Sequence, residues 1–179
     1  MKSIIAKFNS GILAFVLLSL AACSGQQENQ TETATQETTE EVQSSSIQTR
    51  EISGVVDGYL QLKDALVASN ADAARQVAIS MVDIADADDM PQVIQAVTEI
   101  SNTTNLEAQR VHFELLSTSM YEQIQNGVDP DQTLYKQYCP MAFDDKGAYW
   151  LSAQEEIRNP YFGDRMLKCG SVQETLAAK

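Results

Sequence analysis

Two short segments near the C-terminal end of the chain each place a thiol close to a thioether. The first is Cys139-Pro140-Met141, and the second is Met166-Leu167-Lys168-Cys169. Thiolate and thioether sulfurs are soft donors that select ions such as Cu(I), Ag(I) or Zn(II), whereas hard ions want oxygen. In an oxidising compartment, two cysteines without a competitor commonly form a disulfide instead. The spacing alone leaves two interpretations open: a soft-metal site, or a Cys139–Cys169 disulfide with methionines nearby.

The expected backbone geometry would bring these sulfur atoms together in pairs. Side chains two residues apart on a strand point to one face, so Cys139 and Met141 would project together. Residues three apart on a helical turn are neighbours, so Met166 and Cys169 would do the same. Four sulfurs converge if the two segments face each other. His112, the chain's only histidine, borders the apolar face of its predicted helix, where it could add a nitrogen ligand or act as a hydrogen-bonded packing residue.

The N-terminal segment has the features of a bacterial lipoprotein leader. Residues 1–22 combine Lys2 and Lys7 with an apolar stretch that is too short to span a membrane, and Leu20-Ala21-Ala22-Cys23 has the form of a lipobox. We expect Cys23 to be the lipid-modified first residue of the mature protein, anchored in the membrane by its acyl chains. Ser24 follows it, where an aspartate would suggest retention in the inner membrane. We therefore expect the mature protein to be located at the periplasmic face of a membrane, with the outer membrane favoured.

The net charge limits the classes of partner that the protein could bind, and the composition separates a predicted tether from a predicted folded domain. The chain has 12 basic and 25 acidic residues, a formal net charge of −13. This balance argues against nucleic acid and against electrostatic docking on anionic lipid. Residues 23–49 are rich in Gln, Glu, Thr and Ser and hold no aromatic residue, so we expect a disordered tether. Residues 50–179 are enough for one domain with its own core.

Apolar residues recur at helical spacing in four stretches of this domain. The stretches are bounded by Asn70, Pro91, the polar residues 101–105 and Asn126-Gly127, which are typical helix boundaries. Four amphipathic segments joined by short polar loops predict a mainly α fold, an antiparallel four-helix bundle. The apolar positions are Val55, Tyr59, Leu62 and Leu66; Ala74, Val77, Met81 and Ile84; Val93 or Ile94, Val97 and Ile100; and Leu106, Phe113, Leu116, Met120 and Ile124.

Beyond Pro130 the pattern changes from helix to strand. Residues 133–139 and 148–151 are rich in strand-forming residues, and Asp144-Asp145-Lys146-Gly147 between them predicts a hairpin turn. We expect a small C-terminal β-hairpin, an irregular loop at residues 159–163 and one or two final helical turns. The aromatic residues concentrated here predict that the hairpin packs on the bundle.

No arrangement of residues predicts catalysis. The one histidine lies in a predicted helix that holds neither cysteine, and the sequence has no Ser/His/Asp order, Gly-rich phosphate loop or two-histidine metal pair. We therefore expect a protein that is not an enzyme and uses no nucleotide or organic cofactor.

The C-terminal block resembles an uncharacterised bacterial domain family. That family occurs as small exported proteins and at the C-terminal end of CusB-type heavy-metal efflux adaptors. Over residues 55–172, the resemblance implies a helical-bundle domain associated with copper or silver, with metal carried by His112, Cys139, Met141, Met166 and Cys169. It does not imply transport, because the chain has no room for an adaptor's long hairpin and barrel domains. The residues that carry the resemblance are Gln137-Tyr138-Cys139-Pro140-Met141-Ala142, Gly147, Trp150-Leu151-Ser152, Ile157-Arg158-Asn159-Pro160-Tyr161-Phe162-Gly163, Met166 and Cys169-Gly170, with His112 and Leu116-Ser117 upstream.

These patterns together predict an envelope lipoprotein that binds a soft metal ion, Cu(I) before others. It would act as a metal buffer or as a donor to other metal-handling envelope proteins. Thiolates would supply the affinity, and thioethers would hold the ion weakly enough to pass it on. The alternative is a non-metallated periplasmic interaction module, in which a Cys139–Cys169 disulfide pins the hairpin to the bundle.

Overall fold

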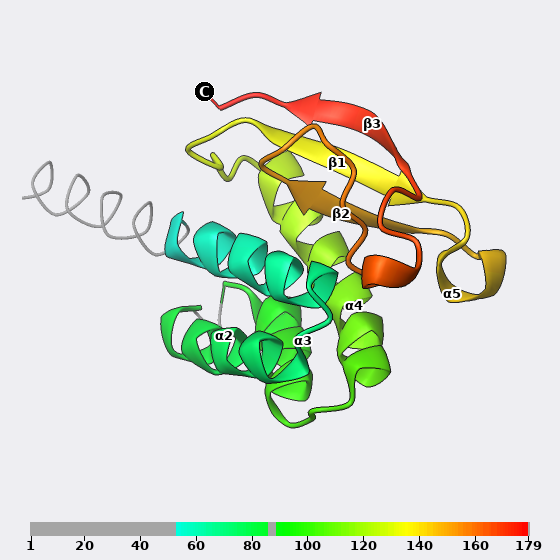
Figure 1. Ribbon diagram of the computed structural model, residues 1–179. Helices are drawn as coiled ribbons and strands as arrows, with labels where there is room; N and C mark the ends of the chain where they lie inside the picture. The colour runs from blue at the N-terminus through cyan, green and yellow to red at the C-terminus, as the bar shows by residue number, and fades with distance from the viewer. Residues whose placement is uncertain (1–52, 86–88, 179) are drawn as a thin grey trace, which may run out of the picture.

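The computed structural model describes residues 53–85 and 89–178 of the chain. The predicted leader at residues 1–22, the lipidation site Cys23 and the predicted tether at residues 23–49 lie outside the described residues. Within the described ranges, no helix is both long enough and apolar enough to cross a membrane. The fold is mainly helical and ends in a small antiparallel sheet, which confirms the predicted fold class (Figure 1).

Four long helices fill the first part of the described chain, and their ends follow the predicted boundaries. Asn70 accepts a hydrogen bond from the backbone N–H of Ala73, and Asn105 accepts one from that of Ala108, both at 3.0 Å. These side chains satisfy N–H groups that a first helical turn leaves without partners. Pro91 is in the first turn of its helix, where its missing N–H is not needed. The helices are described over residues 53–67, Ala71–Ile84 (α2), Pro91–Ser101 (α3) and Leu106–Gln125 (α4).

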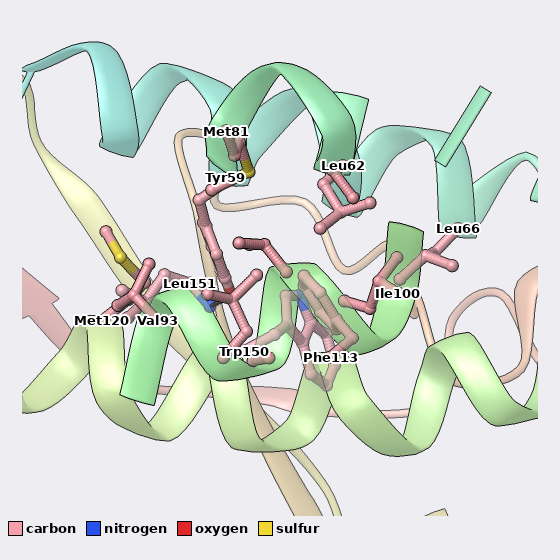
Figure 2. Close-up of a cluster of buried hydrophobic side chains, with 14 of the residues drawn as sticks. Tyr59, Leu62, Leu66, Met81, Val93, Ile100, Phe113, Met120, Trp150 and Leu151 are labelled. Atoms are coloured by element: carbon pink, nitrogen blue, oxygen red, sulfur yellow. Dashed lines mark hydrogen bonds between the residues drawn. The ribbon is translucent and has the colours of Figure 1, made fainter. Parts of the chain in front are cut away.

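The core lies where the helix at residues 53–67 and α4 meet the sheet. Tyr59 and Phe113 stack with their ring centroids 5.2 Å apart, and both side chains are fully buried (Figure 2). The Tyr59 hydroxyl also hydrogen-bonds with the Ser117 hydroxyl at 2.8 Å and accepts the backbone N–H of Leu151 at 2.9 Å. Burial raises the pKa of Tyr59 above its ordinary value. One neutral tyrosine therefore joins both helices to the sheet.

The sheet has three strands, one more than the predicted hairpin. Their order is β2-β1-β3 and both pairings are antiparallel, with β1 at Leu134–Cys139, β2 at Ala148–Ser152 and β3 at Ser171–Leu176. The hairpin of β1 and β2 is confirmed, and the expected helical turns are present as a 3₁₀ turn at Gly163–Arg165 and the turn that follows it. β3 comes after these turns and was not predicted, because it is a short edge strand whose side chains are largely polar and exposed. Such a strand lacks the apolar alternation that marks a buried one.

The connection from β1 to β2 is a left-handed turn, not the simple hairpin turn predicted at residues 144–147. Its short element α5 (Ala142–Asp145) has positive φ at Phe143 (53°), Asp144 (56°) and Asp145 (64°). This backbone conformation costs about 1–2 kcal/mol per residue for side chains with a Cβ, although aspartate tolerates it better than most. The turn lies at the end of the sheet opposite the C-terminus (Figure 1).

Arg110 of α4 fastens the segment after β2 to the helices. Its side chain is buried, and its Nε donates a hydrogen bond to the carbonyl of Pro160 at 2.9 Å. The same guanidinium donates to the carbonyl of Leu66 at 3.3 Å and to the hydroxyl of Ser69 at 3.2 Å, and it pairs with Glu107 at 2.9 Å. A buried charge is stable only when its donors are satisfied, so this arginine requires the three segments to meet.

Candidate metal site

The two cysteines meet where the end of β1 faces the loop before β3. Cys139 is the last residue of β1 and is fully buried, whereas Cys169 is partly exposed. Their sulfur atoms lie 2.9 Å apart, and both residues are free thiols. The fold thus joins two side chains that are 30 positions apart in the sequence. Two thiols in contact can coordinate one soft ion or be oxidised to a disulfide.

Asn159 fixes the backbone that carries Cys169. The asparagine is fully buried, and its Nδ2 donates to the carbonyl of Cys169 at 2.8 Å. Its Oδ1 accepts the backbone N–H groups of Tyr161 at 2.8 Å and Phe162 at 3.3 Å, and its own N–H donates to the carbonyl of Leu167 at 2.9 Å. A buried network that is satisfied in this way specifies a single conformation. The position of Cys169 therefore depends on one amide side chain.

Gly170 allows the chain to turn from Cys169 into β3. Its φ of 145° is one that side chains with a Cβ rarely adopt. A Cβ on this residue would also lie 2.8 Å from the Trp150 ring and 2.9 Å from the carbonyl of Tyr138. Both contacts are too close, so glycine is required for Cys169 to reach Cys139.

Cys169 holds its proton more tightly than an ordinary thiol does. The hydrogen bond with Cys139, followed by burial, raises the pKa of Cys169 to about 11, although a hydrogen bond from the backbone N–H of Met141 lowers it in part. At neutral pH Cys169 is therefore protonated and a poor nucleophile, because thiolate is the reactive form. Thiolate is also the form that binds metal, so a soft cation must displace this proton.

Met141 and Met166 line one solvent-open pocket of about 470 Å³. Met141 is 47 % exposed and lies in the turn after β1, so the prediction that strand geometry points it with Cys139 was wrong. It is nevertheless adjacent to the thiol pair, since its N–H contacts the sulfur of Cys169. Met166 lies one turn before Cys169. The N–H of Cys169 donates to the carbonyl of Met166 at 3.0 Å, in agreement with the predicted turn. Both methionines therefore line the pocket and contact Cys169 through their backbone groups, whereas neither cysteine lines the pocket.

The pocket wall carries three carboxylates, of which one is neutralised. Glu107 accepts hydrogen bonds from Arg110 at 2.9 Å and from Arg165 at 3.0 Å. Asp144 and Asp145 of α5 are exposed, and neither has an ion-pair partner among the described residues. The pocket therefore keeps negative charge beside its two thioethers. The rest of its wall consists of the aromatic residues Phe143, Tyr161 and Phe162 and of Arg165, the partner of Glu107.

His112 lies on a different side of α4 from the thiol pair. Arg110 points toward the segment after β2, as its hydrogen bond to Pro160 requires. His112 is two residues further along, and each helical residue turns about 100°, so its side chain points about 160° away from that of Arg110. In the part of the chain that the structure describes, no three His, Cys, Asp or Glu side chains form a group that could hold a metal. The structure thus brings the two cysteines together and leaves His112 apart.

The sequence patterns do not point to the buried polar residues that hold the site in place. These are Asn159, Arg110 and Gln137, each almost fully excluded from solvent. The Nε2 of Gln137 donates to the carbonyls of Gln154 at 2.8 Å and Glu155 at 3.1 Å, which closes the segment after β2. One signal was available for Gln137, which lies two residues before a buried cysteine in a predicted strand. A polar residue at such a position must find buried partners.

Residues 55–132 match the model of a family described as a protein of unknown function (DUF3347). The match begins in the helix at residues 53–67 and ends before β1. It contains His112, but both cysteines and both methionines of the candidate site lie beyond it. No curated protein and no solved structure matches the chain. The helical part of the chain is therefore similar to a domain family whose function is not known.

Proposed function

We propose that this protein binds one soft metal ion, Cu(I) before others, between Cys139 and Cys169, and acts as a metal buffer or donor in heavy-metal handling. The observation that carries the proposal is the contact of two free thiols, whose sulfur atoms lie 2.9 Å apart at the buried end of β1. Sulfur ligands select soft ions, and a hard ion would need oxygen ligands instead. No chemical reaction is part of this function.

Thiolates and thioethers have different parts in the proposal. Metal–thiolate bonds of about 2.3 Å put two sulfurs of one ion up to about 4.6 Å apart, so the thiols must separate when an ion enters. Cys169 is the side chain with room to move, because Cys139 is fully buried. Met141 and Met166 border the open side, where weaker thioether donors would assist exchange of the ion rather than supply affinity. His112 is not a metal ligand in this proposal.

The sequence supports a location for this function. Residues 1–22 and Cys23 have the form of a lipoprotein leader, so we propose that acyl chains on Cys23 anchor the domain at the periplasmic face of a membrane, with the outer membrane favoured. The resemblance of the C-terminal block to the terminal domain of CusB-type efflux adaptors supports copper or silver as the cargo. Other metal-handling envelope proteins would exchange the ion with this one.

The same thiol contact supports a second candidate function. An oxidising partner could take two electrons from the pair, which would form a Cys139–Cys169 disulfide and release two protons. A bridge over a loop of 30 residues would stabilise the fold by about 3–4 kcal/mol. The protein would then be a non-metallated periplasmic interaction module with a pinned C-terminal loop.

A Cu(I) titration of the reduced chain against a competing chelator tests the metal proposal. We expect Cys139→Ser and Cys169→Ser to lower the affinity by roughly a hundredfold or more, since groups that merely support a ligand already contribute about 10–100-fold. Met141→Leu and Met166→Leu should lower it by roughly tenfold or less, because thioethers are the weaker donors.

Met81→Leu is the matched control for the methionine variants. Met81 is fully buried in the helical core, and a swap to leucine conserves its volume. The control should bind Cu(I) as tightly as the wild type does. Wild-type affinity in both serine variants would contradict the metal proposal. A chain that has no free thiols when isolated without reductant, and that binds no Cu(I), would support the disulfide module instead.

A further inference from the structure

An ion held by the thiol pair has one open side from which to leave. Cys139 is fully buried and ends a central strand, so no path to solvent runs through it. Cys169 is partly exposed, and the next residue to contact its sulfur is Met141, which is 47 % exposed. Met141 and Met166 both line the pocket of about 470 Å³ that opens to solvent. Neither cysteine lines the pocket itself, so Met141 is the residue that connects the thiol pair to this open exit.

The charge of this exit comes from the turn between β1 and β2. Glu107 pairs with Arg165, which also lines the pocket, and with Arg110. Asp144 and Asp145 are therefore the acidic residues of the wall that have no ion-pair partner among the described residues. Both aspartates lie in the left-handed turn of α5, which keeps them on the pocket wall that Met141 also lines. The exit thus combines an exposed thioether with two exposed carboxylates.

We infer that the pocket is a docking port for a positively charged segment of a partner protein that carries a soft sulfur donor, with Met141 as the residue that passes the ion across. This inference rests on the proposed function. The inference names the kind of partner that the pocket would bind, whereas the thiol pair alone does not indicate any partner.

Charge complementarity selects this partner over other occupants. The chain has a formal net charge of −13, so an acidic partner and a second copy of the chain are both repelled. A cationic segment is attracted, and its approach to Asp144 and Asp145 places its sulfur beside Met141. The pocket is also large enough to admit side chains of a partner segment, in contrast to the buried thiol pair.

The transfer is an exchange of ligands and moves no electrons. A sulfur of the partner forms a bond to the ion while a bond from Cys169 breaks, and the ion keeps its charge. The two thiolates take up two protons from water as the ion leaves.

Stopped-flow transfer of Cu(I) from the loaded full chain to synthetic peptides tests the port. Two peptides of equal length carry the same pair of methionines, one among lysines and the other among glutamates. We expect transfer to the lysine peptide to be roughly tenfold faster at low salt, and the difference to shrink at higher ionic strength because salt screens exposed charges.

The double variant Asp144→Asn, Asp145→Asn should slow transfer to the lysine peptide by about fivefold and leave the equilibrium Cu(I) affinity unchanged. Asparagine tolerates positive φ as well as aspartate does, so the turn should be retained. The control Asp83→Asn, Glu99→Gln removes the same charge from exposed positions of α2 and α3. Transfer from the control should stay within about twofold of wild type.

Four outcomes would overturn the port. Equal transfer rates to both peptides, or an equal loss in the control and the Asp144/Asp145 variant, would remove the docking port while Cu(I) binding stands. Faster transfer to a second copy of the chain than to the lysine peptide would show that like copies, not cationic partners, use the pocket. A reduced chain that fails to bind Cu(I) would overturn the proposed function and the port together.

Discussion

The helical part of the molecule and its C-terminal part are stabilised by different interactions. Between residues 53 and 125, buried apolar side chains from all four helices form the contacts, as Figure 2 shows for Leu62, Ile100 and Phe113. From β1 onward, apolar residues such as Trp150 and Leu151 join the same core, but buried amides also hydrogen-bond the backbone and fix the chain, with Asn159 and Gln137 as the main examples. The helices thus form a scaffold, and the polar C-terminal part positions the sulfur atoms.

This difference has a physical basis. Apolar packing is strong but tolerant of small displacements, because it depends on area and not on direction. Hydrogen bonds fix direction and distance, and a buried polar group without a partner is penalised. A pair of thiols that must lie in contact is better placed by the second kind of interaction. Substitutions in the helical part should therefore change mainly stability, whereas substitutions in the C-terminal part should change mainly the thiol site.

The largest expected effect on stability comes from the helical part. Leu116→Ala removes a fully buried side chain of α4 and should lower the free energy of unfolding by about 2–5 kcal/mol in urea titrations. Val111→Ala, at a 53 % exposed position of the same helix, should change it by about 0.5 kcal/mol or less. The Cu(I) affinity of the folded chain should not change in either variant. A large loss of Cu(I) affinity in folded Leu116→Ala protein would contradict the division between scaffold and site.

A smaller change in stability, with a large change at the site, is expected for Asn159→Ala. The variant leaves the carbonyl of Cys169 and the N–H of Tyr161 without their buried partner, at a cost of about 2 kcal/mol. Mass spectrometry should show faster alkylation of Cys169, and the Cu(I) titration should show weaker binding. Arg158→Ala, at the exposed neighbouring position, is the control and should match wild type. Unaltered alkylation in Asn159→Ala would mean that other contacts hold the Cys169 loop.

The smallest effect concerns the proton of Cys169. An unfolded chain releases this proton near pH 8.5, whereas the folded chain holds it until about pH 11, because Cys139 raises the pKa. The resulting stabilisation is fully present below pH 8.5 and is lost as the pH rises toward 11. Cys139→Ala removes the main cause of the shift, so its Tm should fall less over this pH window than that of wild type, by a few degrees at most. Parallel Tm curves for the two chains would contradict the thiol hydrogen bond.

The helical part could be predicted from the sequence because its information is local. Spacing of apolar residues such as Tyr59 and Phe113, with Asn70 and Pro91 at helix ends, is enough to define the helices. The hairpin of β1 and β2 followed in the same way. β3 could not be predicted because a polar edge strand is defined by its partner, here β1, rather than by its own pattern.

The candidate site could be predicted only in part. Residue types indicated the thiol pair, but the positions of the methionines depend on a left-handed turn that no spacing rule describes. The separation of His112 from the cysteines depends on which face of α4 meets the C-terminal part, and Arg110 determines that face through its contact with Pro160. Such contacts join distant segments, so they can be recognised only once the fold is known.

Protection of individual cysteines by Cu(I) tests the central claim most directly. The reduced chain is alkylated with and without one equivalent of Cu(I), for long enough that the buried Cys139 also reacts in the metal-free chain. Modification of Cys139 and Cys169 is measured separately by peptide mass spectrometry. We predict that a single equivalent protects both residues, because both sulfurs bind the same ion. Protection of neither residue, or of Cys169 alone, would contradict a shared site.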